Sequence, residues 1–242
     1  MNLIIDVGNT RVKAAVFKGD TLQKSFSFAH SEIEDQLKKI KKTFQIEYTI
    51  TAKVTSVVDV HLQNRFKKEH FIEVSNRTPV PFKNAYKTPE TLGIDRIALA
   101  AAAVSRFPNR NCLVIDAGTC ITYDFMNHKK EYLGGAISPG VNMRYTALHA
   151  YTNGLPSLNP EQPKELIGTN TEASIHSGII NGVINEMEGV ISCYRIKYPD
   201  LTVVLTGGDT NFLAKQLKSS IFANQNFLLE GLNSILIFNS SK

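Results

Sequence analysis

The sequence predicts an α/β protein built from two structurally similar halves. Strand-like and helix-like segments alternate along the chain, which is typical of that class. The stretch LIIDVGNTRVKAAVF, residues 3–17, is matched in layout by LVIDAGTCITYDF, residues 113–125. In each copy an aliphatic strand ends in Asp, and a small residue, a glycine, a hydroxyl side chain and a second strand follow. Two such units in one chain indicate an internal duplication.

The composition is ordinary for a folded globular protein and excludes wholesale disorder. Of 242 residues, 43% are hydrophobic and 20% are charged. Three scattered cysteines are too few for a disulfide framework or a zinc site, and they fit a reducing compartment. The N-terminal apolar run is interrupted by Asp6, and the longest apolar run, residues 97–104, is too short to span a bilayer. We therefore expect a cytoplasmic protein without a membrane partner.

The net charge of +5 raises the question of a nucleic-acid or anionic partner. The densest basic run, KKIKK at residues 38–42, lies inside a helical stripe of apolar residues. Its lysines are therefore interpreted as the solvated face of a helix. No aromatic residues are interleaved with them to stack on bases, so we expect no nucleic-acid partner.

The first half, residues 1–108, is expected to begin with strands. Strand-like runs lie at residues 3–5, 12–17, 22–28, 48–57 and 71–74, and a short amphipathic helix is expected near residues 61–68. Another helix is expected to begin at SEIE, where Ser31 can cap free backbone amides while Glu34 reaches back to the start.

A long loop and an alanine-rich helix complete the first half. Residues 76–90 carry three prolines, and loops of this length are often functional. The helix is expected from near Gly93 to Pro108. Its first turn contains GIDR, in which the helix dipole alone would favour Asp95. Alternatively, Asp95 takes a proton from a substrate hydroxyl while Arg96 holds an anionic group, and the spacing leaves both interpretations open.

The second half, residues 109–242, continues beyond the repeated motif. GGAISPG at residues 134–140 is expected to form a glycine-rich turn, and TNGLPSLNPEQPKE a loop. Helices are expected at residues 172–194 and 211–217, a strand at residues 202–209, and the apolar run SILIF lies near the C-terminus. TGGD at the end of that strand suits either an ordinary loop or a shelf for a nucleoside.

Asp6 and Asp116 lie at the ends of their strands, where α/β proteins bind ligands. The glycines that follow allow tight turns that bring backbone N–H groups to a phosphate. The hydroxyls of Thr10 and Thr119 can add hydrogen bonds, and the carboxylates can hold Mg²⁺ or its waters. Each Asp could instead cap the turn after its strand. Two copies in register favour a two-sided clamp for a metal–nucleotide, in which Asp6 does not need to be buried.

The residues alone thus indicate a two-lobed ATP-dependent phosphotransferase. Six motifs further resemble those of the type III pantothenate kinases: DVGNTRVK, YKTPETLGIDR, DAGTCITYD, GGAISPG, GTNTEAS and TGGD. They follow one another in the family's order over nearly the whole chain. The first and third are shared widely among actin-like and sugar-kinase-like ATPases, whereas the second is specific. The resemblance implies duplicated actin-like (ribonuclease H-like) domains with the active site in the cleft between them.

The resemblance also implies the reaction, which is transfer of the ATP γ-phosphate to the primary hydroxyl of pantothenate. The product would be 4′-phosphopantothenate, at the first step of coenzyme A biosynthesis. Asp95 would be the general base, and Asp116 would bind a monovalent cation, K⁺ or NH₄⁺, used beside Mg²⁺ or another divalent metal. ATP would be bound by Asp6, Val7, Gly8, Asn9, Thr10, Arg11, Val12, Lys13 and Thr119. Pantothenate would be bound by Tyr86, Gly93, Ile94, Asp95, Arg96 and Thr171. A homodimer is implied as well.

Two other functions stay open. Another actin-like phosphotransferase, acting on a sugar or a small carboxylate, would share the Asp6 and Asp116 pair but would have no reason to carry LGIDR. A non-catalytic ATP-dependent regulator would bind the nucleotide and transfer no phosphate.

Overall fold

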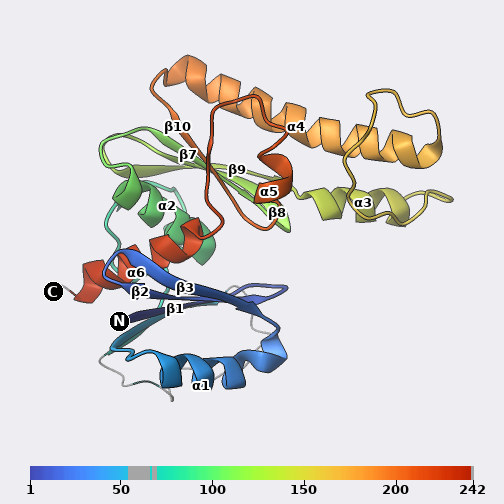
Figure 1. Ribbon diagram of the computed structural model, residues 1–242. Coiled ribbons are helices and arrows are strands. Elements are labelled where there is room, and N and C mark those ends of the chain that lie inside the picture. The colour runs from blue at the N-terminus through green and yellow to red at the C-terminus, as the bar shows by residue number, and fades with distance from the viewer. Residues whose placement is uncertain (54–65, 67–69, 241–242) are drawn as a thin grey trace. The chain divides into compact units, whose positions relative to one another are not determined.

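The computed structural model describes residues 1–53, 66 and 70–240, and its chain divides into two compact units (Figure 1). Unit 1 comprises Met1–Asn109, Lys129–Leu133 and Asn226–Lys242, and unit 2 comprises Arg110–His128 and Gly134–Gln225. The first break is adjacent to the boundary expected at residue 108. Two later segments, however, group with unit 1. Among the described residues, no helix combines the length and the apolar character needed to cross a bilayer.

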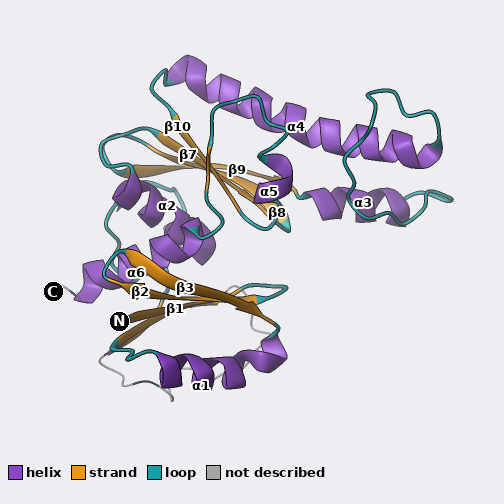
Figure 2. Ribbon diagram, viewed as in Figure 1, coloured by secondary structure: helices purple, strands orange, loops and turns teal. Residues whose placement is uncertain are grey.

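Unit 1 is built on a five-stranded sheet with the strand order β3-β2-β1-β4-β5 (Figure 2). Its strands are β1 (Asn2–Val7), β2 (Val12–Lys18), β3 (Thr21–Phe28), β4 (Tyr48–Lys53) and β5 (Phe71–Glu73). β1 pairs antiparallel with β2 and parallel with β4. These strands confirm the expected ones where the chain is described. The helix expected near residues 61–68 lies almost wholly outside the described residues.

Helices cover both faces of this sheet. α1 (Ile33–Thr43) packs its apolar stripe on one face, and α6 (Phe227–Ser240) packs on the other, with α2 (Ile94–Arg106) against α6 (Figure 1). α6 and α2 are so close that a Cβ on Gly231 would lie 1.8 Å from the carbonyl oxygen of Ala98. This packing groups the C-terminal segment, for which the sequence suggested no element, with unit 1.

The expected capping of α1 by Ser31 and Glu34 is wrong. A 3₁₀ turn, η1 (His30–Glu32), precedes the helix and contains Ser31. The carboxylate of Glu32 accepts a hydrogen bond of 2.8 Å from the backbone N–H of Ala29. Because the 3₁₀ turn moves the free amides toward the N-terminus, the carboxylate that reaches back belongs to Glu32.

The second sheet has the order β11-β10-β7-β8-β9-β6. Its strands are β6 (Lys83–Asn84), β7 (Cys112–Ala117), β8 (Cys120–Met126), β9 (Glu131–Pro139), β10 (Thr202–Thr206) and β11 (Phe222–Ala223). β6 and the start of β9 belong to unit 1, and the other strands form the sheet of unit 2. The order β9-β8-β7-β10-β11 repeats β3-β2-β1-β4-β5, and β7 pairs antiparallel with β8 and parallel with β10. The predicted duplication is therefore confirmed.

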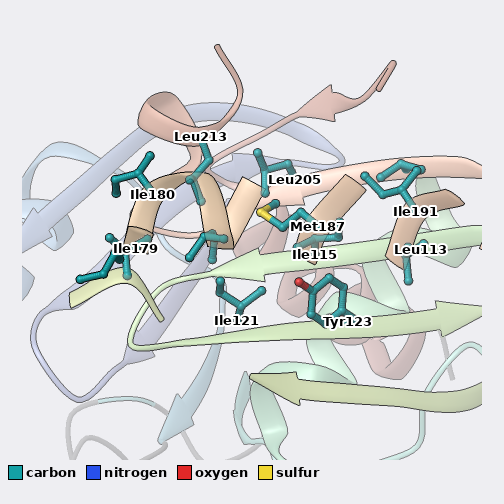
Figure 3. Packing of buried hydrophobic residues seen from close by; sticks show 14 of the residues in the cluster. Leu113, Ile115, Ile121, Tyr123, Ile179, Ile180, Met187, Ile191, Leu205 and Leu213 are labelled. Atoms are coloured by element: carbon teal, nitrogen blue, oxygen red, sulfur yellow. The ribbon is translucent and has the colours of Figure 1, made fainter. Parts of the chain in front are cut away.

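Three helices complete unit 2: α3 (Val141–Ala150), α4 (Thr171–Lys197) and α5 (Thr210–Leu213). Apolar side chains of α4 pack on β7, β8 and β10 and form the core of this unit (Figure 3). The core includes Leu113, Ile115, Ile121, Tyr123, Ile180, Met187, Ile191 and Leu205. α3 was not predicted from the sequence. α5 is shorter than the helix expected at residues 211–217.

GGAISPG forms the end of strand β9 up to Pro139, followed by Gly140 as the N-cap residue of α3, and not the glycine-rich turn that was expected. A Cβ on Gly135 would lie 1.5 Å from the carbonyl oxygen of Tyr123 in β8. Gly134 has a positive φ of 102°. The glycines therefore serve the close approach of two strands, which the sequence pattern alone did not distinguish from a turn.

Candidate active site

The first candidate loop joins β1 to β2 in unit 1. Asp6 pairs with Lys13 across the antiparallel ladder and with Ala52 of β4 in the parallel one. Contrary to the expectation of an open carboxylate, Asp6 is only 8% exposed. Pairing continues one residue further, to Val7 and Val12, so Asp6 still lies within the sheet.

Residues 8–11 form the loop itself, which is fastened at both ends. The Nε2 atom of His30 lies 2.9 Å from the carbonyl oxygen of Gly8. The guanidinium of Arg11 turns toward β3, where its Nε donates to the Ser27 hydroxyl over 2.9 Å and its Nη2 to the Ser27 carbonyl over 3.1 Å. The two residues between these anchors are exposed: Asn9 and Thr10.

The second candidate loop joins β7 to β8 in unit 2 and has three residues between its last paired positions, where the first loop has four. Ala117 pairs with Ile121, as Val7 pairs with Val12 in the first hairpin. Counting back from the paired strands, Thr119 corresponds to Thr10. Counting forward from Val7 and Ala117, Thr119 corresponds to Asn9 instead, so the strand pairing is compatible with either correspondence.

Asp116 lies between two hydroxyl side chains in register. Its partner in β8 is Thr122 and its partner in β10 is Thr206, and both threonines are buried. The Thr122 hydroxyl donates a hydrogen bond of 2.9 Å to Asp124, whose side chain is fully buried. Asp116 thus has two hydroxyl-bearing residues as its register partners, and oxygen atoms are the ligands that hard cations prefer.

Two further glycine motifs of unit 2 meet this loop. Gly140 donates from its backbone N–H to the Thr119 carbonyl over 3.2 Å, and a Cβ on Gly140 would lie 2.2 Å from the Gly118 carbonyl. Gly207, with a φ of +99°, approaches so closely that a Cβ would lie 2.4 Å from the Asp116 carboxylate. Three motifs that are far apart in the sequence, DAGT, GGAISPG and TGGD, therefore converge.

The last residue of TGGD, Asp209, carries a partly buried carboxyl group. The backbone N–H of Asp209 donates to the Ala117 carbonyl over 3.0 Å. In the part of the chain that the structure describes, Asp209 Oδ2 is buried without a hydrogen-bond partner. Burial raises the pKa of this carboxyl.

GIDR lies in unit 1 at the beginning of α2. Gly93 is the N-cap residue, and Ile94, Asp95 and Arg96 form the first turn. The Asp95 carboxylate accepts a hydrogen bond of 2.8 Å from the Arg96 backbone N–H. A Cβ on Gly93 would lie 2.3 Å from Asp95 Oδ1, so the glycine leaves room for the carboxylate to fold back over the helix N-terminus. The helix dipole stabilises a negative charge at that place.

Arg96 is buried and lies against two tyrosine rings. Its guanidinium carbon is 5.8 Å from the centre of the Tyr86 ring and 6.0 Å from that of Tyr132. The two rings are 6.0 Å apart. The structure thus brings together two predicted residues, Tyr86 and Arg96. Sequence reasoning missed Tyr132, although its place two residues before the GGAISPG run was a usable signal.

Asn76 is a second residue that sequence reasoning missed. Its side-chain amide donates to the carbonyl of Pro89 over 2.8 Å and to that of Leu92 over 2.7 Å. It thereby fastens η4 (Pro89–Thr91), the turn that leads into GIDR. Its position at the start of the proline-rich loop did not indicate this role, because the partners are backbone atoms.

Thr171 is the first residue of α4 and lines a pocket of about 1040 Å³ in unit 2. The walls come mainly from α3, α4 and the segment before α4, and Arg144 of α3 is the only charged residue among them within the described chain. Tyr151, which lines the pocket, is exposed, and so are Leu166 and Ile167, which directly precede the lining residue Gly168 in the sequence.

Solved structures of other proteins place the chain in a class of folds. One is a Baf family transcriptional activator from Campylobacter jejuni, with a TM-score of 0.66, 22% identity, and coverage of 99% of this chain and 100% of that one. Another is a glucokinase from an Antarctic psychrotroph, with a TM-score of 0.54, 13% identity and coverage of 98% of both chains. At such identities the likeness concerns the fold alone, which is that of actin-like ATPases and sugar kinases.

The sequence comparisons identify the family within this class. The family described as "Type III pantothenate kinase" matches residues 2–193. A protein of that name from Christiangramia forsetii is 49% identical over 244 residues, covering 100% of both chains. The chain therefore belongs to the type III pantothenate kinase family, as the motifs indicated.

Proposed function

We propose that this enzyme transfers the γ-phosphate of ATP to the primary hydroxyl of pantothenate and so forms 4′-phosphopantothenate for coenzyme A biosynthesis. Membership of the family supports pantothenate as the substrate. The observation that carries the mechanism is the first turn of α2, where the Asp95 carboxylate lies beside the buried Arg96.

In this proposal Asp95 is the general base. It accepts the proton of the pantothenate hydroxyl as that oxygen forms its bond to the γ-phosphorus and the bond to the ADP oxygen breaks. Pantothenate is anionic, and Arg96, held against Tyr86, supplies a positive charge for it. Gly93 and Ile94 shape the same turn, and Thr171 adds a hydroxyl from unit 2.

ATP is proposed to use both hairpins. The exposed part of the first loop, with the exposed hydroxyl of Thr10, offers backbone and side-chain donors to phosphates. In the second loop, Thr119 contributes at the corresponding position. The Cβ position of Gly118 meets no atom within 4 Å, so a ligand can approach its backbone closely. Asp209, with its raised pKa, lies next to this loop and suits hydrogen bonding to a ribose.

The residues fit a divalent metal that arrives with the nucleotide. Among the described residues, no group of three or more His, Cys, Asp or Glu side chains is arranged to hold a metal ion. Mg²⁺ is commonly bound through one or two carboxylates together with substrate phosphates and water, and Asp6 is the carboxylate near the end of β1. The metal would neutralise charge on the phosphates.

A monovalent cation, K⁺ or NH₄⁺, is proposed at Asp116. Its support is the pair of threonines, Thr122 and Thr206, that are the register partners of this residue in the neighbouring strands. Hydroxyl oxygens are neutral, so these partners suit an ion of single charge.

A homodimer is proposed from the exposed apolar side chains around the Thr171 pocket. Tyr151 is 89%, Leu166 77% and Ile167 78% exposed in the single chain. Exposed apolar groups of this kind mark interaction surfaces.

The three free cysteines agree with a reducing cytoplasmic location.

The test is a product assay with a panel of acceptors. Purified protein is incubated with MgATP and K⁺ and with pantothenate, glucose, N-acetylmannosamine or a small hydroxy acid, and the products are identified by mass spectrometry. The proposal expects 4′-phosphopantothenate and ADP in equal amounts. A phosphorylated sugar would favour the other phosphotransferase, and nucleotide binding without any transfer would favour the regulator.

A further inference from the structure

A group of polar side chains in unit 2 joins the sheet, α3 and α4. Glu186 of α4 accepts a hydrogen bond of 2.8 Å from the Tyr123 hydroxyl through Oε1. Its Oε2 forms an ion pair with Arg144 of α3. The same guanidinium donates to the Ser138 hydroxyl over 3.0 Å and, through Nε, to the Pro139 carbonyl over 3.0 Å. One carboxylate thus orients an arginine that holds the end of β9.

The end of β9 is the segment that touches the second candidate loop. Gly140 follows Pro139 directly and donates its N–H to the Thr119 carbonyl. A Cβ on Gly140 would come within 2.2 Å of the Gly118 carbonyl and 2.4 Å of the Thr119 carbonyl. At such close contact, a shift of the segment cannot leave the loop where it is.

Glu186 remains charged in this position. Burial opposes its ionisation, but hydrogen bonds from Arg144, Tyr123 and Ser138 outweigh the burial and lower the pKa of the carboxyl. An ionised carboxylate and a guanidinium form a strong and directional pair, which suits a role in holding a neighbouring segment in place.

We propose that Glu186 is a positioning residue for the kinase reaction, which acts through Arg144 to hold Ser138, Pro139 and Gly140 against the loop of Gly118 and Thr119. The inference rests on the proposed role of that loop in binding ATP. Neither Glu186 nor Arg144 touches the loop itself in the contacts described, so the effect passes through the end of β9.

The same helix offers a matched control. Glu188 is also a carboxylate of α4, and burial opposes its ionisation while hydrogen bonds from Ser219 and Lys218 outweigh it and lower its pKa. It accepts from the backbone N–H of Ser219 over 2.9 Å and holds the segment before β11. Glu188→Gln therefore removes a comparable charge from α4 without involving Ser138, Pro139 or Gly140.

The experiment compares Glu186→Gln, Glu188→Gln, Ser138→Ala and Thr119→Ala by steady-state kinetics, with near-ultraviolet circular dichroism as a check of folding. Glu186→Gln is expected to raise KM for ATP about tenfold while kcat stays within about threefold. Glu188→Gln is expected to change neither. The KM for ATP of the double variant Glu186→Gln/Ser138→Ala is expected to be no higher than that of the more impaired single variant. Both changes interrupt the same chain of contacts, from Glu186 through Arg144 to the end of β9.

Hydrogen exchange of a peptide covering residues 134–141 provides a measurement that does not depend on ATP. Glu186→Gln is expected to speed exchange there, and Glu188→Gln is not. If Thr119→Ala raises KM for ATP but Glu186→Gln changes neither KM nor exchange, the inference is overturned and the proposed function survives. If Thr119→Ala leaves KM unchanged, the proposed ATP contact fails. Unchanged exchange in Glu186→Gln overturns the inference in either case.

Discussion

The hairpins β1–β2 and β7–β8 share one sequence pattern but differ in the residues that lie opposite their aspartates, Asp6 and Asp116. In each, an Asp lies one residue before the end of the first strand and the neighbouring parallel strand lies on the same side. Across from Asp6 are Lys13 and Ala52, whereas across from Asp116 are Thr122 and Thr206. The register partner of Asp6 in the hairpin is thus a positively charged residue, whereas both register partners of Asp116 are neutral threonines.

The loops differ as well. Between its last paired positions the first loop has one residue more than the second, and contacts of His30 and Arg11 hold it in place. Gly140 and Gly207 pack closely against the second loop. Duplication therefore preserved the frame and not the environment of the carboxylates. The difference suggests separate duties, with Asp6 serving the metal–nucleotide and Asp116 a monovalent cation.

The largest expected effect is the loss of kcat when the proposed general base of unit 1, Asp95, is replaced. Asp95→Asn should lower kcat by about 10²–10⁴-fold, because the amide cannot accept the proton of the hydroxyl. ATP affinity, measured by equilibrium dialysis, should change by less than about twofold, because Asp95 lies in α2, outside the two hairpins that are proposed to bind the phosphates. A variant that turned over within about fivefold of the wild type would remove Asp95 from the mechanism.

Two glycines at the second candidate loop, Gly118 within it and Gly207 packed against it, provide a sharper comparison. Gly207→Ala should lower the free energy of unfolding by about 1–3 kcal/mol, because its Cβ would collide with the Ala117 carbonyl and its φ is positive. Gly118→Ala should leave stability within about 0.5 kcal/mol, since its Cβ would meet nothing. Urea unfolding measures both.

Only Gly118→Ala should raise KM for ATP while stability is unchanged, because its new methyl group would occupy space left for the ligand. A normal KM in that variant would show that no ligand approaches this glycine closely.

The aromatic contacts of Arg96 should produce a moderate effect. Tyr132→Leu removes one ring face from the guanidinium, and we expect KM for pantothenate to rise about threefold to tenfold, in line with the strength of a desolvated cation–π contact. Tyr132→Phe retains the ring and is the control. Equal KM values for the two variants would show that the ring face does not position Arg96.

The smallest effect is a pH dependence of stability in unit 2. The folded-state pKa of Glu186 lies below the usual value of 4.5, so its stabilisation is fully present above pH 4.5 and is lost as the pH falls through the folded value. Wild type and Glu186→Gln should differ by about 1 kcal/mol or less at pH 7, which is a few degrees in Tm. The Tm difference should shrink below pH 4.5, and a constant difference would contradict this assignment.

The sequence predicted the duplicated α/β frame because the apolar periodicity and the Asp-Gly turns are local signals. It also indicated GIDR at a helix start, where Asp95 does lie. It could not predict that Asp6 is buried or that GGAISPG is a strand, because both depend on neighbouring strands. The contacts of Glu186 with Tyr123 and Arg144 join residues far apart in the chain, so no local signal pointed to the role proposed for it.

The most direct test of separate duties for the two hairpins is a K⁺ titration of 4′-phosphopantothenate formation. Wild type, Asp6→Asn and Asp116→Asn are assayed side by side at saturating pantothenate and at several ATP concentrations. We expect Asp116→Asn to lose most of its activation by K⁺, and Asp6→Asn to keep the same fold activation with a higher KM for ATP. Undiminished K⁺ activation in Asp116→Asn, or its loss in Asp6→Asn, would contradict the account.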